Sequence, residues 1–291
     1  MNGIIVVDKP AEWTSHDVVA KLRGALKIKR VGHGGTLDPM ATGVLPIFVS
    51  TATRAVEFCE NADKEYIAGL KLGLVTDTQD ITGNVLNTCR TSVFADTLSE
   101  TLPLFLGAQK QLPPMYSAIK VGGKKLYELA RRGIEVPRAE RDIQVYDIEL
   151  LESKENEFLL KIACSKGTYI RTLCHDIGAA LGCGGAMSSL RRTRAGTFAI
   201  DAASPLDEIL SLISSAGAES VLTPIDSVFL DYPSVKLGET ETRRCKNGAP
   251  CSVANTRDGT YRFYGTDDKF LLLGEVVDSK IKTIKGFYEN D

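Results

Sequence analysis

The segment of the sequence best suited to chemistry is the glycine-rich stretch Gly32–Gly43, which carries Asp38 directly before Pro39. Glycines permit backbone shapes that other residues resist, and a proline biases the preceding residue towards an extended or turn conformation. The pattern therefore predicts a carboxylate held on a tightly shaped loop. Because Asp-Pro is also common in ordinary turns, a purely structural aspartate stays open on the pattern alone.

Other familiar chemistries lack the residues they need. Glycoside hydrolysis normally uses two carboxylates, and only Asp38 lies in a distinctive context. A Ser-His-Asp site would need more constrained partners than the three histidines offer. The glycines spell neither a phosphate-binding loop nor a dinucleotide fingerprint. The seven cysteines lack zinc-site spacing, so we expect reduced thiols, no metal and no cofactor.

Basic residues gather in one part of a chain whose net charge is −2. Positions 110–141 hold eight lysines and arginines but only three glutamates. A second group comprises Arg191, Arg192 and Arg194. Clustered cations in a slightly acidic protein are typical of a face that binds a polyanion, although a solvated surface is the alternative.

The elements that must position these groups follow from the spacing of apolar residues. Alternating or continuous apolar runs predict strands at 3–7, 44–49, 64–72, 143–151 and 158–164. Helical spacing predicts one helix that begins at Thr14 or Ser15. It also predicts helices over residues 53–60, 99–106, 125–132 and 169–181. Arg171 falls off the apolar stripe of the last helix, near its start.

The length of 291 residues favours two domains, and turn residues near Phe229–Pro233 place the boundary there. We expect a larger domain over 1–229 and a small β-rich module over 230–291. The apolar run Ile4–Val7 is too short for a signal peptide, and no stretch approaches a membrane span. A cytoplasmic protein without membrane contact is expected.

Several motifs, in order from residue 3 to about 200, resemble the signatures of the TruB family of tRNA pseudouridine-55 synthases. They are DKP with TSHD at 8–17, VGHGGTLDPMATGVLP at 31–46, KEY with TDT at 64–78, LPPMYSAIK at 112–120, GTYIRTL at 167–173 and SSLRRTR at 188–194. The chain departs from the family at two positions. Gly34 stands where the family commonly has Thr or Ala, and Glu12 where it commonly has Gly.

The resemblance implies an isomerase that converts uridine to pseudouridine without a cofactor. Asp38 matches the family's essential aspartate, which acts as a nucleophile or as the key base. Arg171 matches the arginine that pairs with this aspartate, and Tyr66 the tyrosine that stacks on the target base. Tyr169 and Leu190 match a second tyrosine and an apolar wall of the pocket.

The implied substrate is uridine 55 in the T-loop of tRNA, which must be flipped out of the folded loop. Segment 110–141 matches the family's insertion that closes over the T-arm. The residues expected to bind RNA are Lys9, His33, Lys120, Lys124, Lys125, Arg131, Arg132, Arg138 and Arg141.

The implied fold is mixed α/β, with a mixed, largely antiparallel sheet flanked by helices and a small PUA-like C-terminal module. Ten basic and ten acidic residues from Asp231 onwards give this module no charge signature. We expect a monomer that needs no guide RNA. The guide-RNA-dependent class of pseudouridine synthase is one alternative, disfavoured by the insertion and the compact module. A non-catalytic tRNA-binding or tRNA-folding protein is another, disfavoured by the intact motif around Asp38.

Overall fold

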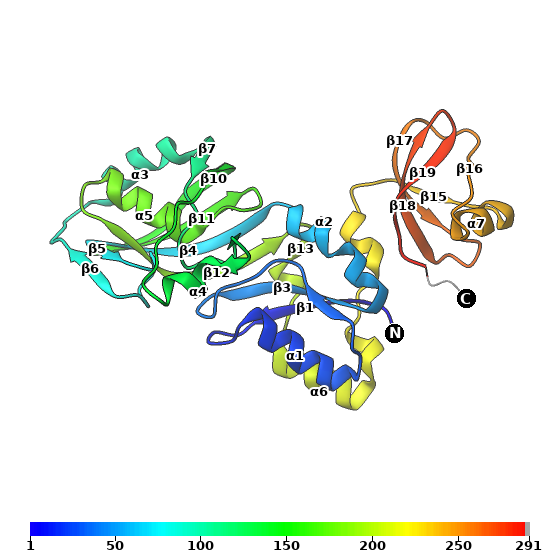
Figure 1. Cartoon of the computed structure of the whole chain (residues 1–291), viewed down its shortest axis with the longest axis horizontal. Coiled ribbons are helices and arrows are strands. Elements are labelled where there is room, and N and C mark those ends of the chain that lie inside the picture. The colour runs from blue at the N-terminus through cyan, green and yellow to red at the C-terminus, as the bar shows by residue number, and fades with distance from the viewer. Residues whose placement is uncertain (289–291) are drawn as a thin grey trace. The chain divides into compact units, whose positions relative to one another are not determined.

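The computed structural model describes residues 1–288 and shows a mixed α/β fold with a smaller β sheet formed near the C-terminus (Figure 1). The α-helices are α1 (Ser15–Leu26), α2 (Val56–Asn61), α3 (Ala95–Thr101), α4 (Leu126–Ala130), α5 (Ile170–Ala180), α6 (Leu206–Ala216) and α7 (Glu239–Lys246). Short 3-10 helices are η1 (Ser50–Ala55), η2 (Leu102–Phe105), η3 (Ile200–Ala202), η4 (Ala218–Val221) and η5 (Ile225–Phe229). Over this described range, no helix is both long enough and apolar enough to cross a membrane.

The chain divides into two compact units. Unit 1 comprises residues 1–39, 43–60 and the described part of 195–291, and unit 2 comprises residues 40–42 and 61–194. Both contain helices and mainly antiparallel strands, so the expected mixed, largely antiparallel fold is confirmed. The sequence placed a domain boundary near residue 229, which does not coincide with the limits of these two units. That boundary stays a prediction.

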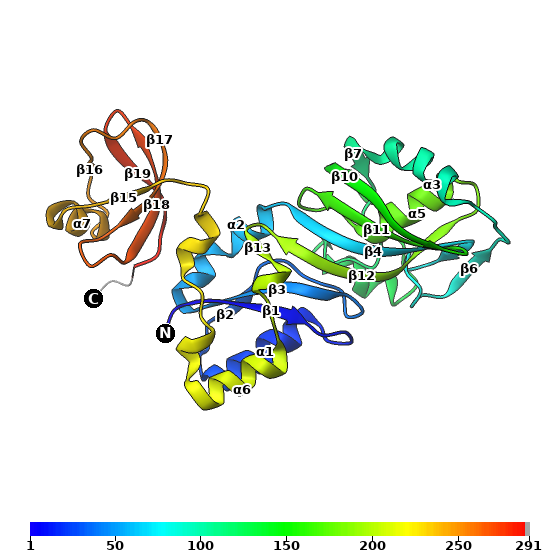
Figure 2. The ribbon, with the colours of Figure 1, turned by 180° about the vertical axis from the view of Figure 1, so that it is seen from behind.

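The first part of unit 1 is a layer of strands with two helices on one side. Its strands are β1 (Gly3–Lys9), β2 (Val31–His33), β3 (Thr42–Val49), β13 (Phe198–Ala199) and β14 (Ser204–Pro205). β1 runs antiparallel to β3 and parallel to β14, and β2 pairs with β3. Figures 1 and 2 show α1 and α6 lying side by side below these strands. A capping box between Thr14 and Asp17 starts α1, as the sequence predicted.

The C-terminal module of unit 1 is a small sheet with its own core. Its strands lie in the order β15 (Ser234–Lys236), β17 (Gly259–Tyr264), β18 (Phe270–Val277), β19 (Lys280–Gly286) and β16 (Cys251–Ser252). Phe263 and Leu272 are fully buried between these strands and α7. The Phe287 ring lies tilted against that of Phe229, with ring centroids 5.6 Å apart, and joins the module to the core of unit 1. The curled sheet fits a PUA-like module.

Unit 2 is built on a row of hydrogen-bonded strands. Its strands lie in the order β12 (Gly185–Ala195), β4 (Lys64–Leu72), β11 (Glu157–Cys164), β10 (Arg141–Lys154) and β7 (Gly107–Gln111). Every second residue of β11 is buried, so its alternating sequence places one face on the core. The predicted strands at 64–72, 143–151 and 158–164 are confirmed as β4, β10 and β11. The helix predicted at 99–106 is displaced: α3 begins at Ala95, and the stretch ends as η2.

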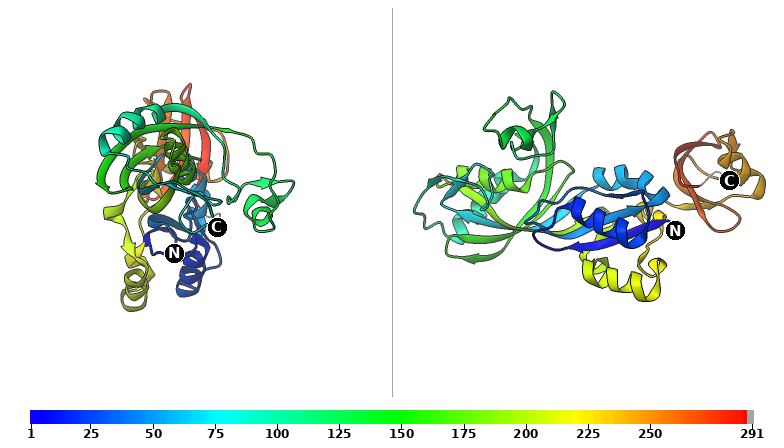
Figure 3. Two further views of the ribbon diagram at one scale, coloured as in Figure 1. Left: turned by 90° about the vertical axis from the view of Figure 1, so that its left-hand side faces the viewer. Right: turned by 60° about the horizontal axis from the view of Figure 1, so that its bottom comes forward.

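Two short hairpins complete unit 2. β5 (Leu74–Thr76) pairs with β6 (Val85–Thr88), and β8 (Lys120–Val121) pairs with β9 (Lys124–Lys125). The second hairpin and α4 belong to segment 111–141, which leaves β7 and returns as β10. Figure 3 shows this green segment standing off the strands from which it departs. We call it the insertion.

Candidate functional site

A buried lysine in unit 1 holds the loop that carries Asp38. Lys9 is 0% exposed, and its Nζ donates hydrogen bonds to three backbone carbonyls, including that of Pro39 at 3.2 Å. The N–H of Glu12 donates to the same Pro39 carbonyl at 2.9 Å. The expectation that Lys9 binds RNA stays a prediction. Its ammonium is enclosed by protein carbonyls, which compensate the cost of burying the charge, and it fixes the turn after Asp38.

The residue before Asp38 is fixed as well. The Ser15 hydroxyl accepts a hydrogen bond from the Leu37 N–H (2.9 Å) and donates to the Leu37 carbonyl (3.2 Å). Gly35 has a φ of 102°, which a residue with a side chain would adopt only under strain. Asp38 is half-buried on a backbone held at both neighbours. Such a fixed backbone suits a reacting side chain, because a small displacement of that side chain slows the catalysed reaction.

His33 lies on β2 in register with Ile47 and is half-buried. Its ring meets that of His16 edge to face, with centroids 5.3 Å apart. His16, which opens α1 beside Ser15, is exposed. The RNA-positioning role of His33 stays a prediction.

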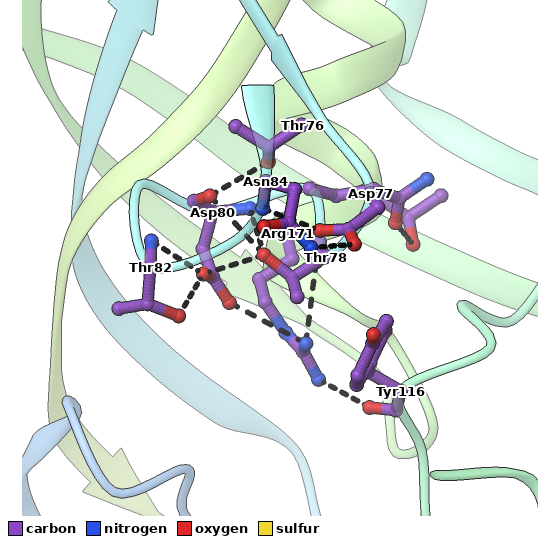
Figure 4. Close-up of polar contacts among 10 residues, drawn as sticks. Thr76, Asp77, Thr78, Asp80, Thr82, Asn84, Tyr116 and Arg171 are labelled. Carbon is purple, nitrogen blue, oxygen red and sulfur yellow. Dashed lines mark hydrogen bonds and ion pairs between the residues drawn. The ribbon is translucent and has the colours of Figure 1, made fainter. Parts of the chain in front are cut away.

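Arg171 lies in unit 2, in the first turn of α5, and is only 6% exposed. Its Nη1 donates to the Thr78 carbonyl (3.3 Å) and lies 3.5 Å from Asp80 Oδ2, and its Nη2 donates to the Tyr116 carbonyl at 2.9 Å (Figure 4). The sequence placed Arg171 off the apolar stripe of its helix, yet it is buried because these partners satisfy its charge and its N–H groups. The pairing of Arg171 with Asp38 stays a prediction.

Asp80 is a buried member of this site that the sequence did not single out. Its Oδ1 accepts hydrogen bonds from the Thr78 hydroxyl (2.8 Å), the Thr82 hydroxyl (2.6 Å) and the Thr82 N–H (3.0 Å). These bonds orient the carboxylate so that Oδ2 faces Arg171 (Figure 4). The available signal was an aspartate flanked by threonines in the turn-rich segment 76–84.

The remaining side chains predicted for the pocket come from three elements of unit 2. Tyr66 in β4 is 9% exposed, and Leu190 in β12 is 8% exposed. Tyr169 precedes α5 and is half-buried, and its backbone is bonded by the side chain of Gln111. Their roles at a uridine stay predictions.

Two thiols near α5 are unsuited to nucleophilic chemistry. Burial raises the pKa of Cys164 to about 11 and that of Cys174 to about 12. Since the thiolate is the reactive form, neither is a nucleophile at neutral pH.

The basic residues of the insertion differ in exposure. Lys125 and Arg131 lie over the Tyr127 ring, 5.4 and 5.5 Å from its centroid, as cation–π partners. Arg138 donates to the Pro113 carbonyl (3.0 Å) and pairs with Glu135 (2.9 Å), so its guanidinium closes the insertion on itself. The cations that are exposed to solvent are Lys120, Lys124, Arg131, Arg132 and Arg141.

The second basic group is smaller than the sequence suggested. Arg192 is 1% exposed and therefore cannot belong to a solvent-facing basic surface, which corrects that expectation. Arg191 is half-buried and donates to the Thr42 hydroxyl at 3.3 Å, and Arg194 is half-buried.

Comparison with known proteins identifies the class to which this fold and these residues belong. Residues 23–170 match the family model of the TruB family pseudouridylate synthase N-terminal domain, and residues 171–230 match that of the tRNA pseudouridylate synthase B C-terminal domain. The chain belongs to the TruB family of pseudouridylate synthases, and it is an isomerase.

Curated relatives match most or nearly all of the chain. The tRNA pseudouridine synthase B of Clostridium kluyveri is 41% identical over 293 residues, covering 99% of this chain and 100% of the relative. The protein of the same name from Alkaliphilus oremlandii is 49% identical over 226 residues, covering 78% of this chain and 75% of the relative.

Solved structures share the fold. A Cbf5–Nop10–Gar1 complex contains a chain that is 28% identical, with a TM-score of 0.76, covering 98% of this chain and 85% of that chain. An H/ACA RNP bound to a substrate RNA containing 2′-deoxyuridine contains one that is 26% identical, with a TM-score of 0.75, covering 99% of this chain and 86% of that chain.

Proposed function

We propose that the chain converts uridine 55 in the T-loop of tRNA to pseudouridine, with Asp38 as the nucleophile or key base. The observation that carries the proposal is the backbone around Asp38, which Lys9 and Ser15 hold on its two sides. The names of the full-length relatives, tRNA pseudouridine synthase B, support tRNA as the substrate.

The reaction needs one carboxylate and no cofactor. The N1–C1′ bond breaks, the uracil turns, and a C5–C1′ bond forms. C5 loses a proton and N1 gains one, so no group enters or leaves the nucleotide. In this reaction Asp38 attacks either the base or the sugar. The ionised carboxylate takes part in both routes.

The target base must leave its stack to reach Asp38. Flipping costs a few kcal/mol, and stacking on an aromatic ring returns about 1–3 kcal/mol per base. Tyr66 supplies that ring in our proposal, and Tyr169 and Leu190 keep water from the pocket. Arg171 orients the aspartate, while Asp80 holds Arg171.

The exposed cations of the insertion bind phosphates of the T-arm, and His33 positions the flipped nucleotides. Phosphate contacts fix the RNA in register without reading its sequence. The PUA-like module from about residue 230 adds a further RNA contact. The protein acts as a cytoplasmic monomer.

A guide-RNA-dependent reaction is the second candidate. It is favoured by the similarity, at 26% identity, to a chain of an H/ACA RNP bound to a substrate RNA. The higher identity to proteins named tRNA pseudouridine synthase B, 41% over nearly the full length, supports the stand-alone reaction instead.

The test is to incubate the purified protein alone with an unmodified tRNA transcript and to map pseudouridine by position. We expect pseudouridine at position 55. Asp38→Ala and Asp38→Asn should form none yet still bind tRNA, whereas Asp147→Asn, an exposed aspartate on β10, should act like the unchanged protein. Product only after addition of a guide RNA would favour the second candidate, and turnover by either Asp38 variant would refute the assignment of that residue.

A further inference from the structure

Gln111 is a buried glutamine whose amide bonds both backbone groups of one residue of the site. It ends β7, where the insertion leaves the strands, and is 3% exposed. The Tyr169 N–H donates to Gln111 Oε1 at 2.8 Å, and Gln111 Nε2 donates to the Tyr169 carbonyl at 3.1 Å. A primary amide carries an acceptor and two donors, so it satisfies both groups as a neighbouring strand would.

This clamp acts where α5 begins. Tyr169 is the N-cap of α5, and no side-chain hydrogen bond of its own caps the helix. The Tyr169 carbonyl also accepts the first helical bond, from the Leu173 N–H at 3.1 Å. Gln111 therefore fixes the residue from which the first turn of α5 is built, and Arg171 lies in that turn.

A second link joins the same two segments. Arg171 Nη2 donates to the Tyr116 carbonyl, which lies in the insertion shortly after Gln111. The Ser117 carbonyl accepts from the Tyr127 N–H of α4 at 3.1 Å. The root of the insertion is thus bonded both to the start of α5 and to α4, which the exposed Arg131 and Arg132 directly follow.

We propose that Gln111 is a positioning residue, which sets Tyr169 and Arg171 by clamping the start of α5 to the root of the insertion. It touches neither the substrate nor the reacting atoms. The inference rests on the proposed function, because it takes Tyr169 and Arg171 to act at the uridine. Buried hydrogen bonds of this kind constrain geometry strongly, since no water can replace them.

Two variants separate hydrogen bonding from packing. Gln111→Met keeps the volume but removes both bonds, and Gln111→Ala removes the bonds and the volume. At saturating tRNA, both should slow single-turnover isomerisation by about tenfold to a hundredfold, the loss typical of a slightly misplaced group. The Kd for tRNA should stay within about twofold. The matched control is Gln109→Ala on the same strand, whose amide donates to the Phe105 carbonyl and whose loss should leave the rate within about twofold.

A measurement without substrate tests the clamp independently of activity. Amide hydrogen exchange in the segment Thr168–Leu173 should speed up in Gln111→Met and stay unchanged in Gln109→Ala. A Gln111→Met protein with wild-type rate and wild-type exchange would overturn the inference, as would a fall in tRNA affinity with an unchanged rate at saturating tRNA. If the unchanged protein failed to modify tRNA, the proposed function would fall, while the exchange result would still decide the clamp.

Discussion

Asp80 Oδ2 and Arg171 Nη1 lie 3.5 Å apart, with both residues almost wholly buried. Asp80→Asn keeps the side-chain shape and one oxygen for Thr78 and Thr82, but it removes the negative charge facing Arg171. The variant should lose about 1.5–3 kcal/mol of unfolding free energy, because a hydrogen bond between charged groups is lost inside the protein. Urea denaturation measures this change, and single-turnover isomerisation should slow in parallel.

The matched control for that exchange is Asp77→Asn in the same loop. The Asp77 carboxylate accepts hydrogen bonds from the Asn84 backbone N–H (2.8 Å) and from the Asn84 side-chain amide (2.9 Å). Asp77→Asn should lower the free energy of unfolding by about 1 kcal/mol and leave the rate at saturating tRNA unchanged. Equal losses of rate in the two variants would mean that the loop, not the Arg171 contact, matters.

Gly34 shows how the chain accommodates one of its departures from the family. A Cβ at Gly34 would lie 2.6 Å from Cys59 Sγ and 2.8 Å from Phe48 Cε2. Gly34→Ala should therefore cost about 1–3 kcal/mol by overpacking. Cys59→Ala removes the sulfur, so the double variant should be more stable than the sum of the single changes predicts, by about 0.5–3 kcal/mol. Urea denaturation of the four proteins forms the cycle.

Gly24→Ala is the control for Gly34→Ala, with the opposite expected sign. Nothing lies within 4 Å of a Cβ added at Gly24, which is inside α1. Alanine favours the helix there by about 0.5–1 kcal/mol. If the changes in unfolding free energy of Gly34→Ala and Cys59→Ala are additive, contact with the Cys59 sulfur is not the reason why glycine occupies position 34.

Local features of the fold could be predicted from the sequence, because local residues determine them. The bounds Lys64–Leu72 of β4 follow from its apolar alternation, and the start of α1 follows from its capping residues. The other departure, Glu12, was visible as a difference from the family but not explicable. The structure gives Glu12 a φ of 65°, a conformation that favours glycine, and this accounts for the family's usual residue.

Contacts between distant residues could not be predicted in the same way. Asp80 meets Arg171 across 91 positions of the chain, and Gln111 meets Tyr169 across 58. No periodicity or turn preference encodes such a pairing, because it depends on how the strands align. The same limit applies to Lys9 and Arg192. Their charge suggested positions on the protein surface, but both side chains are buried.

Tyr264 should make the stability of the protein depend on pH in the alkaline range. Its hydroxyl donates to Asp226 Oδ2 at 2.6 Å. Burial, and then this bond to a carboxylate, raise the pKa of Tyr264 from 10.0 to about 12. The folded state thus holds the phenol proton more tightly than the unfolded chain does. This contribution is complete below pH 10 and is lost as the pH rises towards 12.

Tyr264→Phe lacks that proton, so its stability should be lower than that of the unchanged protein below pH 10, and the difference should shrink between pH 10 and 12. Urea denaturation at a series of pH values measures the difference. Tyr261→Phe, on the same strand, serves as the control for general alkaline effects. A difference that stays constant across this range would contradict the assignment.

Arg131 and Arg132 are exposed at the end of α4 and test whether the insertion binds RNA. If both contact phosphates, each contact displaces counterions, so binding weakens steeply with salt. Replacing both with alanine should lower tRNA affinity and flatten the plot of log K against log salt by roughly one to two units. Chemistry at saturating tRNA should change less, because Asp38 and Arg171 remain.

Filter binding at several salt concentrations measures the slope. The charge-matched control is the double variant Lys21→Ala/Lys29→Ala, which removes two exposed cations outside the insertion. Unchanged affinity and slope would mean that these arginines only solubilise the loop, and the RNA-binding surface would then be sought at Arg191 and Arg194.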